Sequence, residues 1–170
     1  MDILAGSGKD EFYTPVYAIE PIVKYLKPKS TVWCPFDTED SLYYKELTKL
    51  GYKVICTHIA NGFDFFNTNI DCYYIVSNPP YSVKGGVFAR LFEIGKPFAM
   101  LVGIVGLFES KRRFDMFRKN QFEIMYLSKR VSYFESYEDL KPKLNPPFSS
   151  VYLTSKILPK QIVFEDITKT

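Results

Sequence analysis

Apolar residues in the first two thirds of the chain fall into short runs that alternate between two periodicities. Compact runs of apolar, aromatic and β-branched residues, which are typical of buried strands, occupy Thr31–Cys34, Tyr52–Thr57, Cys72–Val76 and Phe98–Val105. Helical spacing of the apolar residues between them predicts helices over Leu42–Leu50, Val83–Ile94 and Glu109–Asn120. This alternation favours an α/β fold with a doubly wound, mainly parallel sheet.

A further helix is predicted near the start of the chain, because Thr14 is a suitable N-cap and Pro15 suits the first helical position. Its apolar stripe consists of Ile19, Ile22, Val23 and Leu26. Residues 1–9 contain Gly6-Ser7-Gly8 and are expected to be flexible. The sequence shows neither a repeat nor a low-complexity linker, so its 170 residues predict a single domain spanning 1–170.

The pattern changes in the last third of the chain. Four apolar runs follow one another there without long helices between them, at Phe122–Leu127, Val131–Phe134, Ser149–Leu158 and Ile162–Glu165. They predict a C-terminal antiparallel hairpin that closes the sheet.

The third predicted strand runs directly into Asn78-Pro79-Pro80-Tyr81. Two prolines in a row lack N–H groups and fix φ, so neither a sheet ladder nor a helix continues through them. The result is a rigid loop at the carboxyl end of a strand, where ligands bind in open α/β sheets. The Asn78 amide oxygen and the Pro79 carbonyl can accept two hydrogen bonds from one planar NH2 group, and Tyr81 can stack on the ring that carries it. The alternative is an ordinary proline turn.

Composition restricts the possible functions and partners only slightly. The net charge of +3 permits a nucleic-acid partner without demanding one. Three isolated cysteines and one histidine argue against a zinc site, and the odd cysteine count fits a reducing cytoplasm. No signal peptide is recognised, and the longest apolar run, Phe98 to Phe108, is too short for a bilayer. We therefore expect a cytoplasmic protein without a membrane partner, whose oligomeric state the sequence leaves open.

The N-P-P-Y segment after a strand resembles the signature of S-adenosylmethionine-dependent amino-methyltransferases, above all those that act on the N6 amine of adenine in DNA. The resemblance covers Phe12 to about Leu158 and is greatest to compact proteins often encoded by bacterial viruses. It implies a Rossmann-like methyltransferase fold, S-adenosylmethionine as cofactor and DNA as partner. Its implied catalytic residues are Asn78, Pro79, Pro80 and Tyr81.

The resemblance also implies a set of cofactor-binding residues. F-Y-T-P resembles the segment that lines the methionine end of the cofactor, and Asp64-Phe65 matches an acid–aromatic pair that contacts the adenine. Pro35-Phe36 matches part of an acidic-Pro-Phe-x-Gly-x-Gly loop after the first strand. The implied cofactor residues are Tyr13, Thr14, Pro15, Pro35, Phe36, Asp37, Asp64 and Phe65.

The loop after the first strand departs from the family pattern. Thr38 and Asp40 stand at the places of its glycines, which let the backbone approach a ligand, and Cys34 replaces the acidic residue. One of the carboxylates of Asp37, Glu39 and Asp40 is then a candidate for the ammonium group of the cofactor. Alternatively, Ser41 simply caps the next helix within a solvated acidic loop. For Asp64-Phe65 the alternative is an Asn-Gly turn followed by buried aromatic residues.

Two basic segments are candidates for nucleic-acid contact. In the helix over Glu109–Asn120, Phe114 and Phe117 are predicted to face the core and to leave the basic residues exposed. The second segment, residues 135–148, is predicted to be a loop beside the first site, and it ends in Asn145-Pro146-Pro147-Phe148, an echo of the first motif. A solvated basic face and a coincidental echo are the respective alternatives. The candidate contacts are Lys111, Arg112, Arg113, Lys141, Lys143 and Phe148.

Two other functions remain open at this point. One is methylation of a different amine, either an RNA base or a protein glutamine. The other is a catalytically degenerate relative that binds nucleic acid or protein, since the cofactor loop lacks glycine.

If the protein is an adenine methyltransferase, methyl transfer to the extruded adenine would rely on proximity and orientation rather than on a strong base.

Overall fold

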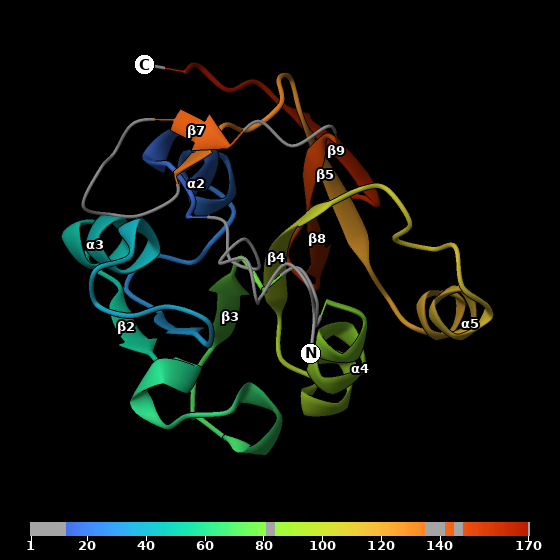
Figure 1. Ribbon diagram of the computed structural model, residues 1–170, viewed down its shortest axis with the longest axis horizontal. Helices are drawn as coiled ribbons and strands as arrows, with labels where there is room; N and C mark the ends of the chain where they lie inside the picture. Colours follow the sequence, from blue (N-terminus) through green and yellow to red (C-terminus); the bar gives the residue numbers. More distant parts are fainter. Residues whose placement is uncertain (1–12, 81–83, 135–141, 145–147, 170) are drawn as a thin grey trace.

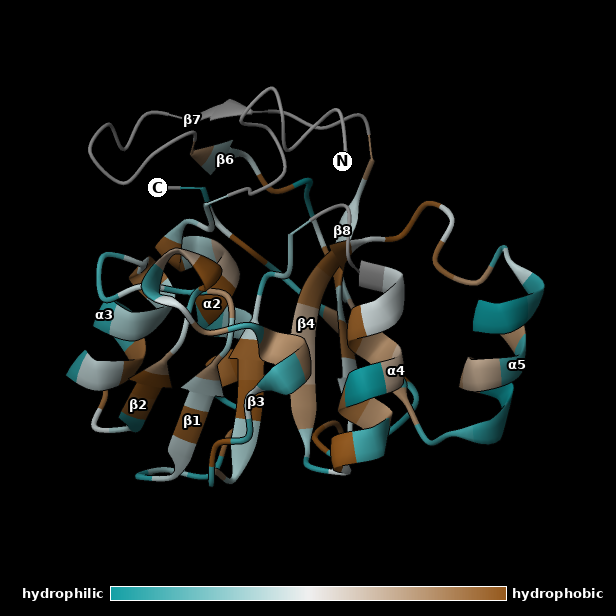
Figure 2. Ribbon diagram, turned by 60° about the horizontal axis from the view of Figure 1, so that its bottom comes forward, coloured by the Kyte–Doolittle hydropathy of each residue, from teal (hydrophilic) through white to brown (hydrophobic). Residues whose placement is uncertain are grey.

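A computed structural model describes residues 13–80, 84–134, 142–144 and 148–169. Its main feature is a seven-stranded sheet with the strand order β2-β1-β3-β4-β8-β5-β9 (Figure 1). A separate ladder of two short strands, β6 and β7, lies beyond one end of this sheet (Figure 2). The strands are β1 (Thr31–Cys34), β2 (Lys53–Cys56), β3 (Tyr74–Ser77), β4 (Phe98–Gly103), β5 (Glu123–Leu127), β6 (Tyr133–Phe134), β7 (Pro142–Leu144), β8 (Ser150–Ser155) and β9 (Ile162–Glu165).

The helices cover both faces of the sheet, with α2 and α3 on one side and α4 and α5 on the other (Figure 1). Two short 3₁₀ helices, η1 and η2, connect β2 to β3. The bounds are α2 (Val16–Val23), α3 (Leu42–Lys49), α4 (Lys84–Ile94), α5 (Lys111–Lys119), η1 (Ile59–Asn61) and η2 (Phe65–Asn67). The predicted α/β fold with a doubly wound, mainly parallel sheet is confirmed.

The core consists of two layers that share the sheet. Side chains alternate along a strand, so Ala99 and Leu101 of β4 face the α2/α3 layer, whereas Phe98, Met100 and Val102 face the α4/α5 layer. All six residues of β4 are buried. This two-sided burial explains why the strand reads as a continuous apolar run rather than as an alternating one.

The C-terminal hairpin is confirmed in part. β8 is antiparallel to both β4 and β5 and lies between them, and all six of its residues are buried. β9, however, runs parallel to β5 and forms the edge of the sheet. The strand predicted over Val131–Phe134 is present at Tyr133–Phe134, but it pairs with β7 in the separate ladder and not with the main sheet.

Two local predictions were wrong. α2 begins at Val16 with Pro15 as its N-cap and has no side-chain cap, because the Thr14 hydroxyl is engaged elsewhere, as described below. In α5, Phe117 is buried as predicted but Phe114 is 48% exposed. The helix packs through the narrow stripe around Phe117, which contacts the rings of Phe88 and Phe108. Over the part of the chain that the structure describes, no helix combines the length and apolar character needed to cross a membrane.

Candidate active site

The sheet has a topological switch point between β1 and β3. From β1 the chain moves to β2 on one side, and β3 then pairs with the other side of β1. The segments that follow β1 and β3 therefore diverge at the carboxyl ends of these strands, which is where ligands generally bind in open α/β sheets. Both motifs predicted for the site, 35–41 and 78–80, begin at this place.

Asn78 joins two predicted segments across this edge. Its Nδ2 donates a hydrogen bond to the Thr14 hydroxyl over 3.1 Å, and Thr14 is only 1% exposed. The residue before Thr14 is fixed in turn, because Tyr13 and Phe134 exchange two backbone hydrogen bonds of 2.9 and 3.2 Å. With Nδ2 turned toward Thr14, the acceptor Oδ1 is on the opposite side of the amide. Pro79, which follows, is buried.

Asp37 comes to the same edge from β1. Its carboxylate accepts a 2.6 Å hydrogen bond from the hydroxyl of Ser77, the last residue of β3, and its backbone N–H donates to the Thr57 carbonyl. Asp37 is 7% exposed and Ser77 is fully buried. Burial raises the pKa of Tyr43 and Tyr152 in the same layer, and the nearby Asp37 carboxylate adds to both increases. The Asp37 carboxylate therefore lies in surroundings of low polarity, where charges are screened only weakly.

The loop after β1 has no conformation that requires glycine. Among the described residues other than glycine, positive φ occurs only at Lys29 and Lys156, so Thr38 and Asp40 adopt ordinary backbone angles. The Ser41 hydroxyl accepts from the Tyr44 N–H over 3.1 Å, which confirms that Ser41 caps α3. Glu39 and Asp40 are exposed, whereas Asp37 is buried, so only part of this acidic loop is solvated.

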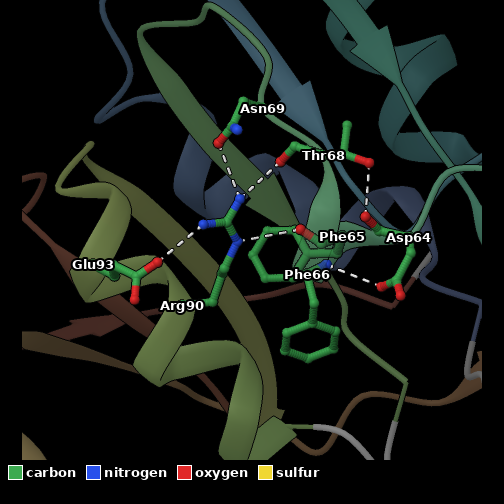
Figure 3. A network of polar contacts seen from close by, with 7 residues as sticks. All are labelled: Asp64, Phe65, Phe66, Thr68, Asn69, Arg90 and Glu93. Atoms are coloured by element: carbon green, nitrogen blue, oxygen red, sulfur yellow. Dashed lines mark hydrogen bonds and ion pairs between the residues drawn. The ribbon is translucent and has the colours of Figure 1, made fainter.

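Asp64 and Phe65 form a turn that is stabilised from within (Figure 3). The Asp64 carboxylate accepts from the Phe66 N–H over 3.0 Å, and the Thr68 hydroxyl donates to the Asp64 carbonyl over 2.7 Å. Phe65 is 3% exposed, and its ring lies 5.5 Å from that of Trp33. An Asn-Gly turn followed by a buried aromatic residue, the alternative considered above, thus describes the local structure at Phe65.

Two residues of this region were not anticipated. Arg90 of α4 donates to the carbonyls of Phe65 and Thr68 over 3.3 and 3.0 Å and thereby holds the turn against the helix (Figure 3). Phe66 is 39% exposed and lies over Gly86, where an added Cβ would be 3.4 Å from the ring. Phe66 is thus more accessible than Phe65. The sequence signal for it was the pair of phenylalanines, Phe65-Phe66, that follows Asp64.

The basic residues of α5 divide into different roles. Arg113 is half-buried and donates to the Gly106 carbonyl over 2.9 Å, so it anchors the helix. Lys111, like Arg118, forms an ion pair with Asp115, and both cations also lie over the exposed ring of Phe114, at 5.9 and 5.2 Å from its centre. Arg112 is exposed. The hydrophilic character of this helix is evident in Figure 2.

The second Asn-Pro-Pro segment reaches the same edge of the sheet at its last residue. Phe148 lies directly on Gly103, the end of β4, where an added Cβ would be 2.7 Å from the ring. Since β4 is the neighbour of β3, this places Phe148 one strand away from the strand that carries Asn78. Lys143 belongs to β7. The predictions for Tyr81 and Lys141 concern positions outside the described residues.

Two solved structures share this fold. One is the methyltransferase subunit of a type I restriction-modification system from Streptococcus thermophilus, with 15% identity, a TM-score of 0.50, and coverage of 94% of this chain and 48% of that one. The other is a modification subunit of a putative type I restriction enzyme from Vibrio vulnificus YJ016, with 13% identity, a TM-score of 0.50, and coverage of 98% and 49%. This chain spans about half the length of either structure.

No protein-family model matches the sequence, and no curated protein matches it significantly. At 13–15% identity the two structures establish the fold alone, an α/β fold with a doubly wound, mainly parallel sheet. Among the residues that the structure describes, no three His, Cys, Asp or Glu side chains group as metal ligands would.

Proposed function

We propose that this protein is a methyltransferase that transfers a methyl group from S-adenosylmethionine to the N6 amine of adenine in DNA. The observation that carries the proposal is the Asn78–Thr14 hydrogen bond. It brings together, at the switch point of the sheet, two segments 64 positions apart that the family resemblance had singled out independently. Ordinary proline turns give no reason for these two segments to meet there.

The residues at this edge fit the methionine end of the cofactor. The buried carboxylate of Asp37 suits an ammonium group, because an opposite charge offsets the cost of its burial. Tyr13, Thr14 and Pro15 would line the same end, together with Pro35 and Phe36. When bound, the cofactor supplies a methyl group activated on a sulfonium.

The adenine end would be held by the turn at residues 64–66. In this proposal Asp64 accepts from the adenine amine, and Phe65 supports the turn from the core. Because the Phe65 ring is covered, we assign the exposed ring of Phe66 as a face for the adenine.

The target base would be held by the loop after β3. The Asn78 Oδ1 and the Pro79 carbonyl accept from the target NH2, which orients its lone pair, and Pro80 keeps the loop rigid. Tyr81 stacks on the base after it has left the duplex. These contacts form fully only when the amine begins to react, so they act mainly on the rate.

DNA would approach over α5 and the second Asn-Pro-Pro segment. Phe114 and the flanking cations combine a π-face with positive charge, a pairing that suits unstacked bases and phosphates. Arg113 would contribute through the position of the helix. The remaining contacts in this proposal are Lys111, Arg112, Lys141, Lys143 and Phe148.

Two observations favour a second candidate, a nucleic-acid-binding relative without catalysis. The loop after β1 lacks the glycine turn of the family, and Phe65, the aromatic residue expected at the adenine, packs against the rings of Trp33 and Phe36, whose centres are 5.5 and 5.1 Å away. If cofactor binding has been lost, the sheet edge and α5 would still form a surface for nucleic acid.

The test is transfer of tritiated methyl groups to unmodified DNA, RNA and a protein extract. We expect label in DNA, none with Asn78→Ala, and normal transfer with Asn61→Ala, a matched exposed asparagine in η1. Calorimetry should show that Asn78→Ala keeps its cofactor affinity. Label in RNA or protein would identify another amine as the substrate. Absence of both transfer and cofactor binding would establish the non-catalytic candidate.

A further inference from the structure

The edge strand β9 exposes two large apolar side chains. Phe164 is 76% exposed and Ile162 is 49% exposed. Both lie on the same face of the sheet as Tyr126 of β5, whose ring stacks on that of Phe164 at 5.7 Å. Proteins usually protect an edge strand with charged residues, proline or a bulge. The one charged residue of β9, Glu165, is on the opposite face and forms an ion pair with Lys24, so the exposed face of this edge is suited to pairing with another strand.

The backbone of the same two residues points to the open side. Within the β5–β9 ladder, Ile124 N–H donates to the Gln161 carbonyl over 2.8 Å and Ser128 N–H donates to the Glu165 carbonyl over 3.0 Å. Odd-numbered residues of β9 therefore direct their backbone groups to β5, and Ile162 and Phe164 direct theirs away from it. Among the described residues, no strand pairs with this side of β9.

We infer that β9 docks against β9 of a second copy of this chain, in an antiparallel pair about a two-fold axis at Val163. In this register Ile162 is opposite Phe164 of the second copy, and the two residues exchange both backbone hydrogen bonds. The reciprocal pair does the same on the other side of the axis. The interface is isologous, and the two seven-stranded sheets join into one continuous sheet.

Charge complementarity selects this register. With the axis at Val163, Lys160 is opposite Asp166 of the second copy, and both residues are exposed. Moving the axis to Ile162 would place Lys160 against Phe164, and moving it to Phe164 would place Ile162 against Asp166. Only the register at Val163 matches apolar with apolar residues and a cation with an anion.

The end of β9 is also fixed in position by contacts of Glu165. Glu165 forms an ion pair with Lys24 and accepts a hydrogen bond from the Tyr25 hydroxyl, so the two residues that follow α2 fix the end of β9 from the opposite face. Two four-residue strands bury little area, which places this interface in the weak, concentration-dependent class.

The first test is the mass in solution by sedimentation equilibrium across a wide range of protein concentration. The wild type should shift from the 19.8 kDa monomer toward twice that mass as concentration rises. Phe164→Lys should remain a monomer throughout, with circular dichroism to show that it is folded. Phe114→Lys, a matched change of an exposed phenylalanine on α5, should dimerise like the wild type. A wild type that is monomeric at every concentration, or dimerisation by Phe164→Lys, would overturn the inference.

The second test addresses the register. Val163→Cys places two thiols opposite each other at a non-hydrogen-bonded position, where the backbone spacing suits a disulfide. Mild oxidation should give a covalent dimer in this variant. The wild type, whose cysteines are Cys34, Cys56 and Cys72, serves as the control and should not be cross-linked. A Val163→Cys dimer that remains uncross-linked would exclude the axis at Val163.

Discussion

At the residue scale, side chains far apart in the sequence determine what each polar group near the site does. The Thr14 hydroxyl is chemically suited to cap a helix, yet it accepts from Asn78 instead. Asp37 stands in an acidic loop, yet it is buried against Ser77. In both cases a buried polar group requires a partner, and the edge of the sheet supplies one.

Thr14→Val tests whether the Asn78 amide is positioned by Thr14. Valine keeps the shape of the side chain but removes the acceptor, so we expect methyl transfer to slow about fivefold to tenfold, equivalent to ~1 kcal/mol for one hydrogen bond. Thr14→Ser, which retains the hydroxyl, is the control. The contact can be checked independently by NMR, because the side-chain NH2 signals of Asn78 should move in Thr14→Val. Unchanged NH2 signals would show that this hydrogen bond is absent in solution.

Gly103→Ala tests the placement of Phe148. An added Cβ would lie 2.7 Å from the Phe148 ring, so the ring has to move, and overpacking of this kind costs about 1–3 kcal/mol. We expect a lower midpoint of urea unfolding for Gly103→Ala. In a Phe148→Leu background the same change should cost clearly less, because the smaller side chain leaves room. Equal costs in the two backgrounds would argue against the contact.

At the element scale, polar side chains on or next to α2, α4 and α5 connect these helices to neighbouring segments of the chain. Arg90 holds the turn at residues 64–69 to α4, and Arg113 holds α5 to the Gly106 carbonyl. On the other face, Glu165 of β9 is held by Lys24 and Tyr25, which follow the last residue of α2. The hydrogen bond to Glu165 and burial raise the pKa of Tyr25 to about 12. Although burial opposes it, the hydrogen bonds from Lys24 and Tyr25 hold the pKa of Glu165 below its ordinary value.

The Tyr25–Glu165 contact predicts a pH dependence of stability. A tyrosine whose pKa is higher in the folded protein stabilises it fully below the ordinary value of 10.0, and this contribution is lost as pH rises toward 12. We therefore expect the wild type to be more stable than Tyr25→Phe at neutral pH and to lose that advantage over this range. Urea midpoints measured for both proteins at each pH would check it. A constant difference would show that the hydroxyl is not bonded to Glu165.

Acidification should also weaken the Tyr25–Glu165 contact, because it protonates the Glu165 carboxylate. The pKa of Glu165 is lower in the folded protein, so its contribution is present above its unfolded value and is lost as pH falls through the lower, folded value. Glu165→Gln should therefore lose less stability than the wild type over that fall in pH, again measured by urea midpoints.

At the scale of the whole molecule, two core layers share one sheet. The strands β1, β3, β4 and β8 contribute side chains to both layers, so neither layer can form without the backbone that serves the other. We therefore expect both layers to unfold together, as one domain.

Trp33 provides the test of this cooperativity. It is the only tryptophan in the sequence, it is 1% exposed, and its indole N–H donates to the Thr57 hydroxyl over 2.9 Å. Its fluorescence should move to longer wavelength on unfolding, at the same urea concentration at which far-ultraviolet circular dichroism reports loss of the helices. Two separate midpoints would show that the layers unfold independently.

The sequence by itself determined where most strands and helices lie and where the candidate site begins. Periodicity and proline act locally, so the strand that ends at Ser77 and the break at Pro79-Pro80 were readable from neighbouring residues. The α/β class followed from the order of these elements, because strands alternating with helices have few ways to pack. The resemblance of residues 12–15 and 78–81 to a known family could also be recognised from the sequence alone.

Tertiary structure decided the features that depend on partners far along the chain. It placed β8 between β4 and β5, since a strand buried over its whole length needs a neighbour on each side. It turned Thr14 toward Asn78, covered Phe65 with other aromatic rings and left Phe114 outside the helix contact. In each case local chemistry allowed several arrangements, and the final one was selected by burial and hydrogen bonding between distant segments.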